Sequence, residues 1–185
     1  MTILTPANQL TLVRMMLIPA LVLFVVYGYA GWALVTFVVA GITDGLDGLI
    51  ARWRGQKTSL GAFLDPMADK LLLVSSFVVL TVPGLDLANR LPLWLTVLVI
   101  SRDVVIVLTV AAVSLVVGAR TFYPSAFGKA ATLVFILTVA VTLFCNYLDR
   151  PSWVVDVAVW ASLVATLVSG IHYIVHAARI VNETR

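Results

Sequence analysis

The amino-acid sequence predicts an all-α, polytopic membrane protein with six transmembrane helices, in one domain that covers residues 1–185. Of its residues 62% are hydrophobic and only 11% are charged, and the mean hydropathy is +1.08. A soluble domain of this length cannot bury so much apolar surface. In a bilayer the backbone must satisfy its own hydrogen bonds, and a spanning helix does so with about 20 apolar residues.

The six helices are expected where apolar stretches recur along the chain. Met15 to Val26 could be read as the core of a signal peptide, but the chain stays hydrophobic to its end, so we interpret this stretch as a first membrane helix. Turn-forming segments rich in Gly, Pro, Asn and Asp separate the stretches. The expected helices cover roughly residues 8–28, 31–54, 61–82, 91–117, 126–147 and 152–178.

The distribution of basic residues predicts the orientation, because cytoplasmic loops carry more Lys and Arg. Arg90 and Arg150 fall on one side of the membrane. The other side holds Arg14, Arg52, Arg54, Lys57, Arg120, Lys129, Arg179 and Arg185. We therefore expect both termini in the cytoplasm. The net charge of +3 is small and does not indicate a nucleic-acid partner.

Acidic residues gather around the connection between the second and third expected helices. Asp44 and Asp47 are three residues apart, and Asp65 and Asp69 are four apart, so each pair shares one helix face. The short connection makes the two helices antiparallel neighbours, and the pairs can face each other near the cytoplasmic boundary. Pro66 allows two starts for the third helix: Asp65 caps it, with Pro66 at its first position, or it begins near Gly61 and bends.

Four aspartates at a membrane boundary need compensation. Two carboxylates about 5 Å apart repel by roughly 3 kcal/mol at an effective dielectric near 20. Shared protons could neutralise some of them, whereas divalent cations could neutralise all. Carboxylate oxygens suit Mg²⁺ or Mn²⁺, and two such ions can clamp a diphosphate. Gly45, Gly48 and Gly61 would allow a ligand or helix to approach closely, and Arg52 offers a planar fork to phosphate.

The spacing of these residues resembles the signature of the CDP-alcohol phosphatidyltransferase family. The pattern is Asp-x2-Asp-Gly-x2-Ala-Arg-x8-Gly-x3-Asp-x3-Asp, and every fixed position is filled between Asp44 and Asp69. The resemblance implies six transmembrane helices, a homodimer, and an active site open to the cytoplasm, which in a bacterium means the inner membrane. It also implies two divalent metal ions, Mg²⁺ or Mn²⁺, as cofactors.

The same resemblance implies roles for individual residues. Asp69 matches the general base as well as a metal ligand, and Asp65 matches the ligand that bridges the two ions. The metal ligands would be Asp44, Asp47, Asp65 and Asp69. The CDP moiety of the donor, CDP-diacylglycerol, would contact Asp47, Gly48, Ala51, Arg52 and Gly61.

The acceptor alcohol is less strongly indicated. The opening Pro6-Ala-Asn-Gln-Leu-Thr-Leu-Val-Arg14 and the segment Gly128 to Thr132 resemble family members that use glycerol 3-phosphate. The Arg102-Asp103 pair on the fourth helix is more similar to members that use phosphatidylglycerol. Either acceptor carries a phosphate, and the cations that could bind it are Arg102, Arg120 and Lys129. Each has an alternative interpretation: Arg102 as an ion pair, the other two as topology charges.

Two further hypotheses follow from the residues. Intramembrane aspartates also occur in cation transporters, but a transporter has no need of Gly48, Arg52 and Gly61 at fixed spacing. His172 and His176 are four apart and could bind a metal, but no third ligand is evident, so we interpret them as an interfacial pair.

Overall fold

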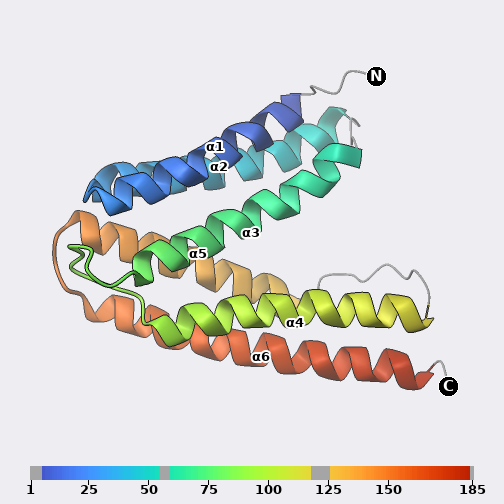
Figure 1. The fold of residues 1–185 in the computed structure, drawn as a ribbon. Helices are drawn as coiled ribbons and strands as arrows, with labels where there is room; N and C mark the ends of the chain where they lie inside the picture. The colour runs from blue at the N-terminus through green and yellow to red at the C-terminus, as the bar shows by residue number, and fades with distance from the viewer. Residues whose placement is uncertain (1–5, 55–58, 118–125, 184–185) are drawn as a thin grey trace. The chain divides into compact units, whose positions relative to one another are not determined.

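The computed structural model describes residues 6–54, 59–117 and 126–183, with side chains for residues 9–44, 64–109, 111 and 126–175. In that part of the chain the regular structure is entirely helical (Figure 1). The helices are α1 (Pro6–Val26), α2 (Ala30–Arg54), α3 (Ser59–Thr81), α4 (Leu93–Val117), α5 (Ala126–Tyr147) and α6 (Trp153–Glu183). The predicted all-α fold with six helices is therefore confirmed, and every start lies within about two residues of its prediction.

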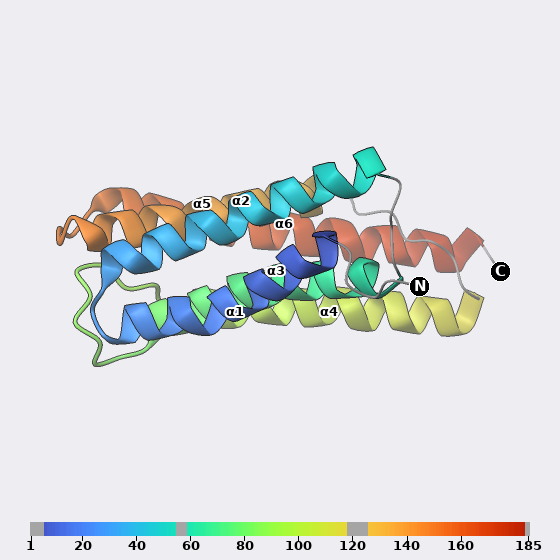
Figure 2. The same cartoon turned by 90° about the horizontal axis from the view of Figure 1, so that it is seen from above.

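The chain divides into two compact units. The first comprises Met1–Arg90 and Val139–Ser152, and the second comprises Leu91–Thr138 and Trp153–Arg185. Within the first unit α1 packs against both α2 and α3, and within the second α4 packs along α6 (Figures 1 and 2). Helix α5 contributes residues to both units. The assignment of one domain to residues 1–185 stays a prediction.

Polarity in both units is arranged as expected for a protein in lipid. Fully buried side chains include polar ones such as Arg14, Ser76 and Ser162, whereas large apolar ones such as Trp32 and Trp160 are mostly exposed. Three helices in the described residues are long and apolar enough to cross a membrane: Gln9–Val26, Ala126–Tyr147 and Trp153–Val175. Their outward apolar surface would face acyl chains, so the protein is membrane-embedded.

Helices α1 and α5 end in the same way. After α1, Gly28 adopts a φ of 77°, its N–H donates to the Val25 carbonyl at 3.1 Å, and the Tyr29 N–H donates to Phe24 at 2.8 Å. After α5, Asp149 adopts a φ of 51° and the same two bonds form. These are Schellman motifs, in which a left-handed residue satisfies the last helical carbonyls. They turn the chain sharply into α2 and α6.

Two buried asparagines join the loop after α3 to the end of α5 in the first unit. The backbone N–H of Asn89 donates to Asn146 Oδ1 at 2.7 Å, and Asn146 Nδ2 donates back to the Asn89 carbonyl at 3.0 Å. Asn89 also donates through Nδ2 to the Arg150 carbonyl at 2.8 Å and accepts from the Ser152 N–H at 2.8 Å. Each of the two side chains thus satisfies two backbone groups: Asn146 those of Asn89 after α3, and Asn89 those of Arg150 and Ser152 after α5.

Candidate functional site

Helices α2 and α3 carry the aspartates of the predicted site. Asp44 lies on α2, and Asp65 and Asp69 lie one turn apart on α3. Helix α3 already begins at Ser59 and keeps Pro66 inside it, so of the two expected starts the one near Gly61 is correct. The start of α1, the end of α2 and the start of α3 lie at the same end of the first unit (Figure 1). The start of α1 therefore lies at the same end as the last turn of α2 and the first turn of α3, which are distant from it in sequence.

The side chain of Arg14, on α1, joins the aspartates of two different helices. Its Nη1 lies 2.8 Å from Asp44 Oδ1 and 2.7 Å from Asp69 Oδ1. The Arg14 side chain is 0% exposed, whereas those of Asp44 and Asp69 are 46% and 43% exposed. Because both carboxylates bind one nitrogen, they are close neighbours. The arginine is buried behind them, and they remain accessible to a ligand.

Thr11 makes the corresponding contact to the third aspartate. Its Oγ1 donates a hydrogen bond of 2.6 Å to Asp65 Oδ1. Thr11 and Arg14 are three residues apart on α1, so they share one face of the helix, and both are fully buried. That face of α1 therefore contacts Asp44, Asp65 and Asp69.

Neither Thr11 nor Arg14 is among the site residues predicted from the sequence. Both belong to the N-terminal segment Pro6–Arg14 that resembles other family members, and Arg14 is also one of the topology charges. The signal that could have revealed them is a Thr and an Arg three apart inside an otherwise apolar span, where an unpaired charge is costly.

The donor set has the right chemistry for a hard divalent cation, since Asp44, Asp65 and Asp69 offer only carboxylate oxygens. Among the described side chains, however, no three Asp, Glu, His or Cys residues lie close enough together to hold a metal ion. The Arg14 guanidinium contacts both Asp44 and Asp69. The side chain of Asp47 lies outside the described residues.

Several other predicted site residues also lie outside the described side chains. Gly48, Ala51 and Arg52 belong to α2, and Gly61 belongs to α3, but only their helical backbone is described. Arg120 lies outside the described residues altogether. Their roles in CDP or acceptor binding stay predictions.

The remaining acceptor candidates belong to the second unit. Arg102 Nη1 donates to its neighbour Asp103 at 2.7 Å, and Nη2 donates to Ser169 Oγ on α6. The Arg102 side chain is 10% exposed, and its Nε is buried with no hydrogen-bond partner among the described residues. Lys129 lies exposed in the first turn of α5. The ion pair considered as an alternative for Arg102 is thus present, while a phosphate-binding role stays a prediction.

The histidine prediction can be checked at one position. The centroid of the His172 ring lies 4.6 Å from the centroid of the Phe127 ring. His176 lies outside the described side chains. His172 and Phe127 come from α6 and α5 of the second unit, and the interfacial position of the histidine pair stays a prediction.

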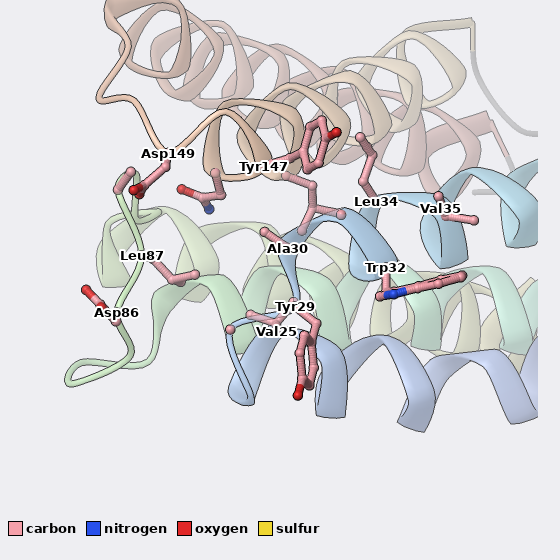
Figure 3. Close-up of a pocket in the computed structure, with 15 residues that line it drawn as sticks. Val25, Tyr29, Ala30, Trp32, Leu34, Val35, Asp86, Leu87, Tyr147 and Asp149 are labelled. Carbon is pink, nitrogen blue, oxygen red and sulfur yellow. The ribbon is translucent and has the colours of Figure 1, made fainter.

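A cavity of about 830 Å³ lies in the first unit beside the turns that precede α2 and follow α5. Asp86 and Asp149 line one end of it, and Trp32, Leu34 and Val35 line the other (Figure 3). None of the predicted site residues lines this cavity. The aspartates bound by α1 are therefore a separate feature.

The chain matches the CDP-alcohol phosphatidyltransferase family over residues 4–169, and it belongs to that family of membrane-embedded transferases of phospholipid biosynthesis. It is 36% identical to a probable phosphatidylglycerophosphate synthase of Mycobacterium tuberculosis, over 97% of this chain and 84% of that protein. It is 33% identical to a cardiolipin synthase (CMP-forming) of Streptomyces coelicolor, over 82% of this chain and 69% of that protein. A human cardiolipin synthase (CMP-forming) is 41% identical over 57% of this chain and 34% of its own length.

Proposed function

We propose that this phosphatidyltransferase moves a phosphatidyl group from CDP-diacylglycerol to glycerol 3-phosphate and releases CMP, with divalent metal ions as cofactors. The convergence of Asp44, Asp65 and Asp69 at the α1 face carries the catalytic part of the proposal. The breadth of similarity to the probable phosphatidylglycerophosphate synthase supports glycerol 3-phosphate as the acceptor.

Four aspartates would hold the cofactor: Asp44, Asp47, Asp65 and Asp69. When bound, two Mg²⁺ or Mn²⁺ ions would neutralise the diphosphate of the donor and the charge on the departing CMP. The accessible carboxylates of Asp44 and Asp69 and the oxygen-only donor set support this assignment.

The chain's own contribution to the reaction begins with Asp69. Its carboxylate takes the proton of the acceptor hydroxyl, because a hydroxyl is a weak nucleophile at neutral pH. The acceptor oxygen then forms a bond to the β-phosphorus, and the bond from that phosphorus to the CMP oxygen breaks with its electron pair. The diacylglycerol moiety stays in the bilayer throughout.

The remaining residues would bind and orient the substrates. Gly48, Ala51 and Gly61 would leave room for the CDP moiety, while Arg52 would donate to its phosphates. The phosphate of the acceptor would bind the cations Arg102, Arg120 and Lys129. The site would face the cytoplasm at the inner membrane, as the basic residues predict, and the enzyme would act as a homodimer.

An acceptor panel tests the proposal. Purified protein with CDP-diacylglycerol and Mn²⁺ should release CMP when glycerol 3-phosphate is added, and chelation with EDTA should stop the release. A protein that releases CMP only with phosphatidylglycerol would contradict the acceptor. Undiminished turnover in EDTA would contradict the metal.

A second candidate acceptor is phosphatidylglycerol. The observation that favours it is the Arg102–Asp103 ion pair on α4, together with similarity to the Streptomyces coelicolor cardiolipin synthase. The same panel separates the two, because only this acceptor would give cardiolipin. A cation transporter is not supported, since family membership makes the chain an enzyme.

A further inference from the structure

The three described aspartates of the site are all bound by one face of α1. Arg14 reaches Asp44 and Asp69 with a single nitrogen, and Thr11 reaches Asp65. The partners lie 54 and 55 residues further along the chain for the Thr11–Asp65 and Arg14–Asp69 bonds. These are tertiary contacts, which local helix structure alone would not produce.

The burial of the partners is unequal. Arg14 and Thr11 are 0% exposed, while the carboxylates that they bind are partly exposed. A fully buried guanidinium is tolerated only where anions compensate its charge. A partly exposed carboxylate could be solvated by water instead, so the arginine depends on the aspartates more than they depend on it. The buried Arg14 guanidinium can therefore hold the carboxylates of Asp44 and Asp69 from the protein interior, while a ligand approaches them from their exposed side.

We infer that Thr11 and Arg14 are positioning residues, and that Arg14 is the resident counterion of the aspartate cluster in the metal-free enzyme. The inference rests on the proposed metal site. Arg14 limits the repulsion between Asp44 and Asp69 before any metal is bound, and Thr11 fixes the carboxylate of Asp65 one turn of α3 away. The cluster can then exist in a nearly assembled form that metal ions enter.

This role has a consequence that a purely structural arginine would not have. Without the Arg14 charge, the metal-free carboxylates of Asp44 and Asp69 lose a counterion and repel each other more strongly. Metal ions then supply the compensating charge that Arg14 otherwise provides. The folded state should therefore gain more stability from metal when Arg14 is absent than when it is present.

Thermal unfolding of the purified full-length protein in detergent, in EDTA and in excess Mn²⁺, tests the inference. Arg14→Gln should lower the Tm in EDTA by several degrees and should enlarge the Mn²⁺-induced rise in Tm relative to the unmodified protein. Arg14→Lys should recover part of the loss, because it restores the charge without the planar fork. Arg90→Gln is the matched control, since Arg90 is exposed and bonds only to the Leu85 carbonyl among the described residues. It should leave both values unchanged.

The outcomes separate this inference from the proposed function. If Mn²⁺ stabilises the unmodified protein but its effect is equal or smaller in Arg14→Gln, the counterion role is wrong and the metal site stands. If Mn²⁺ does not stabilise the unmodified protein, the metal site is contradicted. In that case the EDTA samples alone decide the counterion role through Arg14→Gln/Asp69→Asn.

The double variant also serves if Arg14→Gln fails to fold. Removing the Asp69 charge relieves the repulsion that loss of Arg14 creates, so the double variant should be more stable in EDTA than Arg14→Gln. A double variant that is no more stable than the single one would overturn the inference.

Discussion

The hydroxyl of Thr11 lies 2.6 Å from the carboxylate of Asp65, so the first helix of the chain reaches an aspartate of the third. The donor, Thr11, is fully buried. The bond ties a residue outside the family signature to one inside it.

Replacing Thr11 by Val removes this donor and keeps the shape of the side chain. We expect CMP release to fall roughly tenfold, because the loss of one hydrogen bond to a charged group corresponds to about 1.5 kcal/mol. Thr11→Ser should retain most of the activity. Thr81→Val is a suitable control, since the Thr81 hydroxyl donates to the Phe77 carbonyl of its own helix at 2.7 Å. Equal losses in the two valine variants would exclude a specific role for Thr11.

Asp69→Asn tests the proposed base. The amide cannot accept the proton of the acceptor hydroxyl, so CMP release should fall roughly 100- to 10,000-fold at saturating Mn²⁺. Turnover is measured with CDP-diacylglycerol and glycerol 3-phosphate. Asp86→Asn, at an exposed loop position beside the cavity, should keep normal turnover. An Asp69→Asn protein with turnover near that of the control would remove Asp69 from the role of base.

Asn89→Ala should destabilise the first unit. It leaves the Arg150 carbonyl and the Ser152 N–H without the bonds that the Asn89 side chain provides. The expected loss is about 2–3 kcal/mol of unfolding free energy, measured by denaturant titration in detergent micelles. Arg90→Gln changes the neighbouring exposed residue and should stay within about 0.5 kcal/mol of the unmodified protein. A loss below 1 kcal/mol for Asn89→Ala would mean that these bonds contribute little.

Replacing Gly28 by Ala and replacing Gly41 by Ala should change the Tm in opposite directions. A Cβ at either position meets no heavy atom within 4 Å, so packing does not decide the result. Gly28 has a φ of 77°, where Ala is strained by about 1–2 kcal/mol, so Gly28→Ala should lower the Tm. Gly41 lies inside helix α2, where Ala is favoured over Gly by about 0.5–1 kcal/mol, so Gly41→Ala should raise it. Shifts of the same sign would contradict this account.

Much of the fold could be predicted from the sequence, because a helix that crosses lipid must be apolar over about 20 residues and so stands out as an apolar stretch. The connections expected near residues 28–31 and 147–152 lie where α1 and α5 end, and they contain the left-handed residues Gly28 and Asp149. The prediction for the last helix stopped at residue 178, whereas α6 continues to Glu183. Hydropathy falls when polar residues begin, but residues such as Ala and Arg continue a helix readily beyond the apolar part.

The site was predictable only in part. The spacing of the aspartates placed Asp65 and Asp69 on one face of a helix, and the structure agrees. The contacts of Arg14 and Thr11 could not be read from local periodicity, because their partners lie on other helices, up to 55 residues away. Arg102 was ambiguous for another reason: a buried arginine beside an aspartate has the same sequence pattern whether it neutralises a neighbour or binds a phosphate.

The position of Arg14 near the start of the chain bears on how the protein is made. Asp69 is synthesised 55 residues after Arg14, which at about 5–20 residues per second is a delay of roughly 3–11 seconds. Asp44 on α2 is synthesised before Asp69, so α2 supplies the first anionic partner of Arg14 and α3 supplies the second. The place of Arg14 toward the beginning of α1 allows the long side chain to stay among the lipid headgroups until those helices enter the membrane. Burial of Arg14 is therefore a late event of biogenesis that depends on the arrival of both later helices.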